Sequence, residues 1–229
     1  MSSAWPGYAR RTGANPTSPP SILGRLNTAQ ARIIASEFNY RKGSEIYGEK
    51  EPAEYVYQLT AGAVRSYKLL SDGRRQIGAF HLVGDVFGLE NGSFHRFTAE
   101  AIVDTSVRLI KRSSLERVAE ADVSITHDLL YMTADNLQHA EDHMLLLGRK
   151  TSLERVVAFL LEMDRRLTAA GILVLPMCRR DIADYLGLTL ETVSRALSKL
   201  HEDGILGFLG KNQRQIILLD RQQLANLNL

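Results

Sequence analysis

The sequence predicts an α+β protein with three successive parts: a small jelly-roll β-barrel, one long helix, and a compact helical domain that ends in a β-hairpin. Short β-rich runs with glycine turns lie between about residues 40 and 112. An uninterrupted helical pattern covers about 123–147, and shorter helical patterns follow Thr151. We therefore divide the chain into a flexible tail (1–20), a barrel domain (21–120), a long helix (121–150) and a C-terminal domain (151–229).

The tail is rich in Pro, Gly, Ser and Thr, a composition typical of flexible segments. A short helical pattern follows over about Asn27–Phe38, where Ile33, Ile34 and Phe38 can share one face. Barrel strands are then expected at Tyr55–Leu59, Val64–Leu69 and Val103–Ile110, with turns at Thr60–Gly62, Ser71–Gly73, Gly84–Asp85 and Asn91–Gly92.

The long helix carries Leu130, Leu137 and Met144 at intervals of seven residues, with Ala140 and Leu147 in the intermediate seam. A seven-residue repeat buries its stripe best against a second copy of the same helix. We therefore expect these five side chains to form a homodimer interface. The alternative is that the stripe packs on the barrel of its own chain.

Overall composition narrows the class of protein. The chain has 45% hydrophobic and 24% charged residues, as an ordinary globular protein does. It has no apolar run of the roughly 18 residues that span a membrane and no apolar secretory signal at its N-terminus, so we expect a cytoplasmic protein with no membrane partner. The formal net charge of +2 does not indicate nucleic acid, because phosphate binding depends on local charge.

The C-terminal domain contains the pattern of a helix-turn-helix. A short helix begins near Arg179 and ends at Gly187, a residue that readily adopts the positive φ of a sharp helix exit. Thr189 suits the N-cap of a second helix over Leu190–His201. The β-rich runs of Ile205–Leu219 then predict a wing.

The second helix has one apolar and one polar side. Glu191 and Arg195 lie almost opposite its apolar arc, with Ser194 on one flank. Arg can pair with guanine, Glu can accept from cytosine, and Ser can do either, so we expect these three residues to contact bases in double-stranded DNA. The expected buried arc consists of Leu190, Val193, Leu197 and Leu200, and the expected phosphate contacts are Thr189, Thr192 and Lys199.

A weaker interpretation is that Glu191 and Arg195 form an ordinary i,i+4 ion pair on an exposed helix. Their position on the second helix of a helix-turn-helix, followed by Gly204 and a hairpin, favours DNA binding.

The run Arg180–Arg195 resembles the DNA-binding signature of the CRP/FNR transcription regulators, and it is most similar to the FixK branch. The barrel run Gly78–Asp85 is similar to the same family. The resemblance implies a cyclic-nucleotide-binding-type barrel, a winged helix, and an activator that binds a TTGA…TCAA-type palindrome as a homodimer and contacts RNA polymerase. Within it, Glu191, Ser194 and Arg195 match the three base-contacting positions.

The sequence departs from the family where members bind cyclic nucleotides. Those members have a Gly-Glu pair for the ribose and an Arg-Ser or Arg-Thr pair for the phosphate. Here Leu89 follows Gly88, which displaces Glu90 by one residue, and Phe97 follows Arg96. A one-residue displacement turns a strand side chain to the other face, so we expect a filled barrel that binds no cAMP.

Redox and metal chemistry have few candidate ligands. Cys178 is the single cysteine, which excludes an internal disulfide and the cysteine-held cluster of the oxygen-sensing FNR members. His81 is of the residue type that binds haem iron, but a single histidine in a barrel is more often structural. His139 and His143 are spaced i,i+4 without a third ligand, so a solvated helix face is expected rather than a metal site. We expect no cofactor.

Cys178 is the remaining candidate for regulation. It precedes Arg179 and Arg180 at a predicted helix N-terminus, and both features stabilise a thiolate. Oxidation would add bulk and charge beside DNA phosphates and weaken binding. The alternative is a buried N-cap without a redox role.

Two other functions are conceivable. One is an activator gated by a small effector in the barrel. The other is a cupin-like barrel enzyme with an accessory DNA-binding domain, but the barrel offers only His81 and His95 and no assembled catalytic group. We therefore expect a regulator and not an enzyme.

Overall fold

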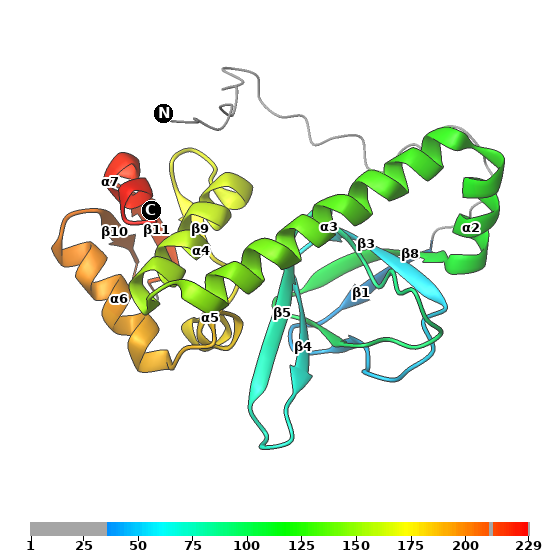
Figure 1. Ribbon diagram of the computed structural model, residues 1–229, viewed down its shortest axis with the longest axis horizontal. Coiled ribbons are helices and arrows are strands. Elements are labelled where there is room, and N and C mark those ends of the chain that lie inside the picture. Colours follow the sequence, from blue (N-terminus) through cyan, green and yellow to red (C-terminus); the bar gives the residue numbers. More distant parts are fainter. Residues whose placement is uncertain (1–35, 211–212, 229) are drawn as a thin grey trace, which may run out of the picture.

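The computed structural model describes residues 36–210 and 213–228 (Figure 1). It has an N-terminal antiparallel barrel, a long helix and a C-terminal winged helix-turn-helix, as the sequence predicts. The expected tail (1–20) and most of the helix expected at Asn27–Phe38 lie outside the described residues. Phe38 itself corrects that expectation, since it belongs to strand β1 (Ser36–Tyr40) and pairs with Val107.

The barrel consists of two four-stranded antiparallel sheets. One has the order β1-β8-β3-β6 and the other β2-β7-β4-β5. Between them lies a core that includes Tyr47, Tyr57, Phe87 and Val107. The remaining strands are β2 (Glu45–Tyr47), β3 (Tyr55–Ala61), β4 (Val64–Leu69), β5 (Arg75–His81), β6 (Val86–Phe87), β7 (Thr98–Ala101) and β8 (Thr105–Lys111).

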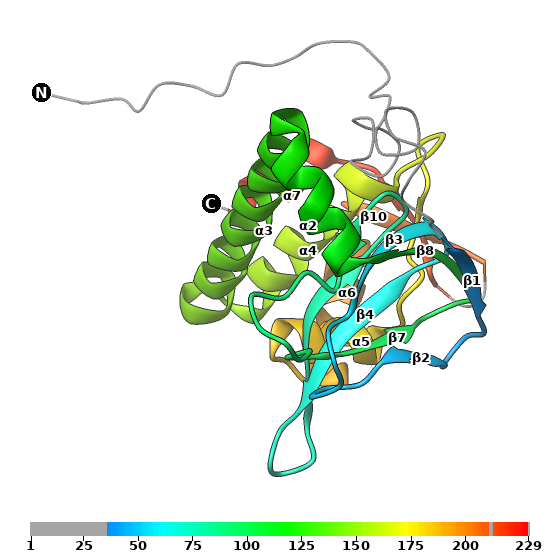
Figure 2. The ribbon, with the colours of Figure 1, turned by 90° about the vertical axis from the view of Figure 1, so that its right-hand side faces the viewer.

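Two helices follow the barrel. Helix α2 (Arg112–Ala121) was not expected from the sequence, and it packs beside α3 (Val123–Arg149) on one flank of the molecule (Figure 2). Asp122 begins α3, because its carboxylate accepts from the backbone N–H of Ser124 (2.9 Å). In the part of the chain described, no helix combines the length and apolarity needed to cross a membrane.

Thr151 caps helix α4 (Ser152–Leu167), as predicted. Its side chain accepts from the backbone N–H of Glu154, whose carboxylate accepts in return from the Thr151 N–H (2.6 Å). This reciprocal pair is a capping box. The rest of the domain consists of β9 (Leu173–Val174), α5 (Arg179–Leu186), α6 (Leu190–Glu202), β10 (Leu206–Leu209), β11 (Gln215–Leu218) and α7 (Arg221–Asn226).

The barrel and the C-terminal domain share one hydrophobic core. Phe80 of β5 packs against Tyr185 of α5 (ring centroids 5.1 Å) and Phe159 of α4 (6.2 Å). Barrel residues Ile77 and Leu82 belong to the same buried cluster. The helix-turn-helix therefore packs directly on the barrel and is not connected to it through the chain alone (Figure 1).

Candidate nucleic-acid interface

Local sequence signals build the turn between α5 and α6. Gly187 has φ +62°, which lets the chain leave α5 in the left-handed conformation. Two residues later, Thr189 Oγ1 accepts from the backbone N–H of Thr192 (3.2 Å) and starts α6. Ile182 and Leu186 are buried on the inner side of α5. The predicted helix-turn-helix is thus present with its predicted turn.

Helix α6 has the predicted buried side, with one shift at its start. Val193, Leu197 and Leu200 are buried, as is Ala196, whereas Leu190 is only half-buried at the helix start. The inner side therefore shifts slightly from the expected arc, while the polar side remains outside.

Base-contact candidates lie on the outer side of α6. Glu191 and Arg195 are exposed, and Ser194 is half-buried. Arg195 Nε lies 3.5 Å from the backbone carbonyl of Glu191, and in the described part of the chain the two side chains form no ion pair. The two side chains therefore do not form the i,i+4 ion pair of the weaker interpretation, and both lie exposed on the outer side of the helix.

Phosphate-contact candidates flank this surface. The Thr189 and Thr192 hydroxyls lie 2.9 Å apart at the start of α6. Lys199 is exposed near its end, where its ammonium pairs with Asp203 (3.2 Å). Hydroxyls at a helix N-terminus and an exposed amine are both suited to phosphate oxygens.

The wing is attached directly to α6. Strands β10 and β11 pair antiparallel, and β9 adds a third strand that the sequence did not indicate. His201 of α6 shares a hydrogen bond with the Leu206 carbonyl of β10 (3.0 Å), and Arg179 of α5 lies over the Phe208 ring (5.8 Å). These contacts hold the hairpin beside both helices.

Cys178 is the N-cap residue of α5, as predicted, and it is half-buried rather than fully buried. Its thiol donates to Asp181 Oδ2 (3.2 Å), the same oxygen that accepts from the Cys178 backbone N–H (3.1 Å). The recorded partner of the sulfur is thus a carboxylate, whereas the Arg179 guanidinium binds Gln213 and lies over the Phe208 ring.

Comparisons with known proteins agree on this architecture. Family models for the cyclic nucleotide-binding domain and the Crp-like helix-turn-helix domain match residues 37–122 and 154–227. The chain is 40% identical over 233 residues to the nitrogen fixation regulation protein FixK of Azorhizobium caulinodans, covering 99% of this chain and 90% of that one. It is 38% identical to the transcriptional activatory protein AadR of Rhodopseudomonas palustris, covering 80% and 79%.

The structure of FixK2 from Bradyrhizobium japonicum matches with a TM-score of 0.83 and 71% sequence identity, covering 86% of this chain and 98% of that one. The chain is a FixK-like member of the CRP/FNR family. It is therefore a DNA-binding transcription regulator and not an enzyme.

In this FixK-like regulator, the predicted seam of α3 lies open. Leu130, Leu137 and Met144 are 66%, 60% and 65% exposed, and Ala140 is exposed as well, whereas Leu147 is half-buried. The alternative that the stripe packs on its own barrel is therefore wrong for most of its length. An exposed apolar stripe of this kind is typical of an interaction surface.

His139 and His143 correct the expectation of a solvated helix face. The His143 ring stacks on Tyr185 of α5 (centroids 4.1 Å), and its Nε2 lies 3.0 Å from the Tyr185 carbonyl. His139 Nε2 lies 3.4 Å from the Tyr185 hydroxyl. Both histidines therefore link α3 to the helix-turn-helix. Among the described residues there is no group of three His, Cys, Asp or Glu that could hold a metal ion.

Aromatic rings and imidazoles pack against one another in the barrel of the regulator. His95 stacks on Tyr47 (centroids 3.6 Å), and Tyr57 stacks on Phe87 (5.3 Å). Burial lowers the pKa of His95. His81 also has a structural place, since its Nε2 lies 2.8 Å from the Ser66 hydroxyl and its ring stacks on Phe87.

The residues nearest to the family's nucleotide-binding positions contact one another. Glu90 accepts from the Arg96 backbone N–H and from Arg96 Nε, both at 3.2 Å. A Cβ on Gly88 would lie 2.7 Å from the Tyr57 ring. The carboxylate, the guanidinium and the glycine are thus occupied by contacts within the chain.

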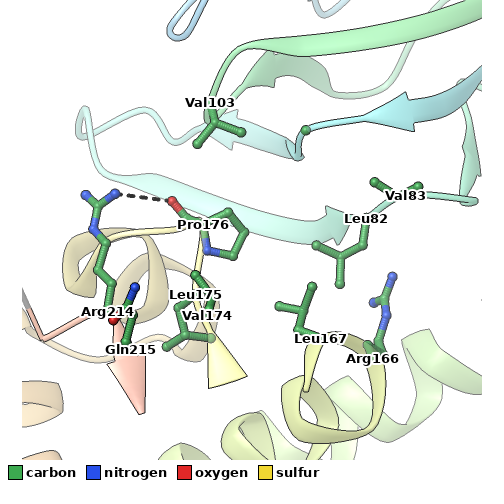
Figure 3. Close-up of a pocket in the computed structure, with 11 residues that line it drawn as sticks. Leu82, Val83, Val103, Arg166, Leu167, Val174, Leu175, Pro176, Arg214 and Gln215 are labelled. Carbon is green, nitrogen blue, oxygen red and sulfur yellow. Dashed lines mark hydrogen bonds between the residues drawn. The ribbon is translucent and has the colours of Figure 1, made fainter. Parts of the chain in front are cut away.

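A cleft of about 420 Å³ lies between residues of the barrel and residues of the C-terminal domain (Figure 3). Its walls are mostly apolar, and Arg166, Arg214 and Gln215 provide its polar side chains. Arg166 also pairs with Asp85 of the barrel. The apolar walls include Leu82, Val83, Val103, Leu167, Val174, Leu175 and Pro176.

Proposed function

We propose that this regulator binds a TTGA…TCAA-type palindrome in double-stranded DNA as a homodimer in the cytoplasm. The observation that carries the proposal is the outer side of α6, where Glu191 and Arg195 are exposed without pairing to each other. Arg195 donates to a guanine, Glu191 accepts from a cytosine, and Ser194 contacts a neighbouring base. Thr189, Thr192 and Lys199 bind phosphates and set the position of the helix.

The homodimer forms through α3. Leu130, Leu137, Ala140, Met144 and Leu147 of each copy pack against the same residues of the other, which removes the exposed stripe from water. Two-fold symmetry then presents two recognition helices to major grooves about one DNA turn, ~34 Å, apart. A palindromic site matches that symmetry.

Selection of bound sequences from a random DNA pool tests this function. For Arg195→Ala, we expect a loss of roughly 1–3 kcal/mol in binding free energy and relaxed selection at one base pair per half-site. Arg165→Ala is the matched control, because Arg165 is exposed on α4 and outside the proposed surface. Equal weakening on all sequences would instead make Arg195 a phosphate contact.

DNA binding proceeds without cAMP or an iron–sulfur cluster. The pairing of Glu90 with Arg96 and the stacked rings of the barrel support binding without cAMP. The single cysteine, Cys178, supports binding without a cluster, which several cysteines would have to hold. We further propose that the dimer activates transcription by contacting RNA polymerase. The similarity to AadR, a transcriptional activatory protein, supports the activating role. Transcription in vitro with and without cAMP tests both parts.

The second candidate is an activator gated by a small effector, and the interdomain cleft is the observation that favours it. A ligand there would change the contact between the barrel and the DNA-binding domain. Purified protein that binds its palindrome with nanomolar affinity in the absence of any added effector would exclude this candidate.

We also propose that oxidation of Cys178 by a peroxide weakens DNA binding. A sulfinate at the N-cap of α5 would bring negative charge towards Asp181 and towards DNA phosphates. DNA affinity is therefore expected to fall after peroxide treatment in the wild type and to stay constant in Cys178→Ser. Equal responses of the two proteins would exclude the proposal.

A further inference from the structure

A cluster of charged side chains joins the helix-turn-helix to the barrel. Its centre is Asp181, a buried residue (2% exposed) at the third position of α5. Asp181 Oδ1 accepts from Arg65 Nη1 (2.8 Å) and from Arg75 Nη2 (2.6 Å). The two arginines come from β4 and β5 of the barrel, so one carboxylate of the DNA-binding domain holds two barrel strands.

The arginines of this Asp181 cluster are themselves fixed. Arg65 Nη2 donates to Glu100 Oε1 (2.6 Å) on β7, and Arg75 Nε donates to Asp184 Oδ2 (2.8 Å) on α5. Three carboxylates therefore share two guanidinium groups, each bound through more than one nitrogen. Such multiple contacts fix orientation as well as distance.

Stability alone does not explain a buried cluster of this kind. Burying charges costs desolvation free energy, and the attraction between the charges often does no more than cancel this cost. Well-packed apolar side chains in the same place would stabilise the fold equally well. The cluster does provide geometry, since the fixed guanidinium planes hold α5 in one rotation relative to β4 and β5.

Neutral contacts add to the same restraint. Gln76 of β5 donates to the Tyr185 carbonyl of α5 (3.3 Å), and His143 of α3 stacks on the Tyr185 ring (4.1 Å). Helix α5 is thus held by the barrel on one side and by α3 on the other. Since α6 packs directly on α5, the restraint extends to the recognition helix.

We propose that Asp181 is a positioning residue that, through Arg65 and Arg75, sets the angle between α6 and α3 and thereby selects the spacing between the two half-sites. This inference rests on the proposed binding of a palindrome by a homodimer. In such a dimer, α3 defines the two-fold axis, so a rotation of α6 about α5 changes the distance between the two recognition helices.

Palindromes whose central spacer is shortened or lengthened by one or two base pairs test the inference. Asp181→Asn keeps a side-chain oxygen for the cap of α5 but removes the charge, and Arg75→Gln removes one partner from the barrel side. In each variant, we expect the ratio of the affinity for the best spacer to the affinity for the second-best spacer to fall about tenfold. A change of this size lies in the usual range of coupling between two sites. Base selection within a half-site is expected to remain as in the wild type.

The combination of the two substitutions distinguishes the cluster from two separate effects. The double variant is expected to lose little more spacer preference than either single variant, because both remove the same contact. Arg75→Lys keeps the charge and is expected to retain most of the preference. Asp164→Asn is the matched control, since Asp164 pairs with Arg221 inside the C-terminal domain (2.9 Å) and does not contact the barrel.

Two results would overturn the inference, given a wild type that binds a palindrome with one preferred spacer. The first is that both variants, folded as judged by thermal unfolding, keep the spacer preference of the wild type. The second is tighter binding by the variants at every spacer, because the cluster would then hold α6 away from DNA. A wild type without a preferred palindrome would instead contradict the proposed function itself.

Discussion

His81 illustrates how one side chain makes stability depend on pH. Burial, together with nearby Arg166 and His139, lowers the pKa of His81 from 6.5 to about 4, although nearby Asp85 opposes the shift. The neutral ring is hydrogen-bonded to Ser66 and stacked on Phe87. Below pH 6.5 the unfolded chain binds a proton that the folded chain does not bind until about pH 4, so acidification favours unfolding over this window.

We predict that His81→Gln reduces this pH dependence. Between pH 7 and pH 5, the wild type should lose roughly 1–2 kcal/mol more unfolding free energy than the variant. Urea unfolding at pH 5, 6, 7 and 8 measures the difference, and the values at pH 8 provide the baseline for the lost stacking on Phe87. An identical pH dependence in the two proteins would contradict the prediction.

Single residues also show where local sequence was sufficient. Gly187, Thr189 and Thr151 each produce a turn or cap through their own backbone or side-chain chemistry, and all three do so where expected. Phe38 shows the opposite. Its helical spacing with Ile33 and Ile34 is a local pattern, whereas its strand conformation comes from pairing with Val107, 69 positions away in the chain.

Among the elements, α3 carries the clearest unpartnered surface. Leu137 is 60% exposed in the single chain, so a charge at this position leaves the fold intact but lies in the centre of the proposed dimer seam. Leu137→Glu brings two carboxylates together across the two-fold axis in an apolar interface, which is unfavourable. We predict a monomer in sedimentation experiments and at least about tenfold weaker binding to the palindrome, because a monomer loses the second half-site.

Gln138→Glu is the matched control for this element. Gln138 is exposed and lies about 100° around the helix from Leu137, so the substitution adds the same charge on a different face. It is expected to remain dimeric and to bind DNA nearly as the wild type does. A dimer that persists in Leu137→Glu would show that α3 pairs through another face.

Contacts between elements were the part of the site that the sequence could not indicate. The helical pattern placed His139 and His143 on one side of α3 but carried no information about the helix packed there, so their stacking on Tyr185 was missed. The role of Asp181 as a contact to the barrel could not be predicted from the sequence either. This residue stands in the predicted helix-turn-helix, yet its partners Arg65 and Arg75 lie 116 and 106 positions earlier in the chain.

Across the whole molecule, positive and negative charges nearly balance, with 28 Lys and Arg residues against 26 Asp and Glu. The formal net charge is +2, so general attraction of DNA is weak, and the salt dependence of binding arises from the few cations that touch phosphates. Lys199 is one such cation in the proposed complex, and a two-fold dimer contains it twice. The symmetry of the dimer therefore doubles the effect of each substitution on salt dependence.

We predict that Lys199→Ala lowers the slope of log affinity against log salt concentration by about two for the dimer, since each released phosphate contact contributes about 0.9. The variant should lose affinity almost equally for all sequences, because a phosphate contact carries no base information. Lys111→Ala is the matched control, because Lys111 is exposed at the end of β8, directly before α2. Figure 1 shows α2 at the opposite end of α3 from α4. The control removes the same charge from the whole molecule, so an equal change in both variants would attribute the salt dependence to net charge and not to Lys199.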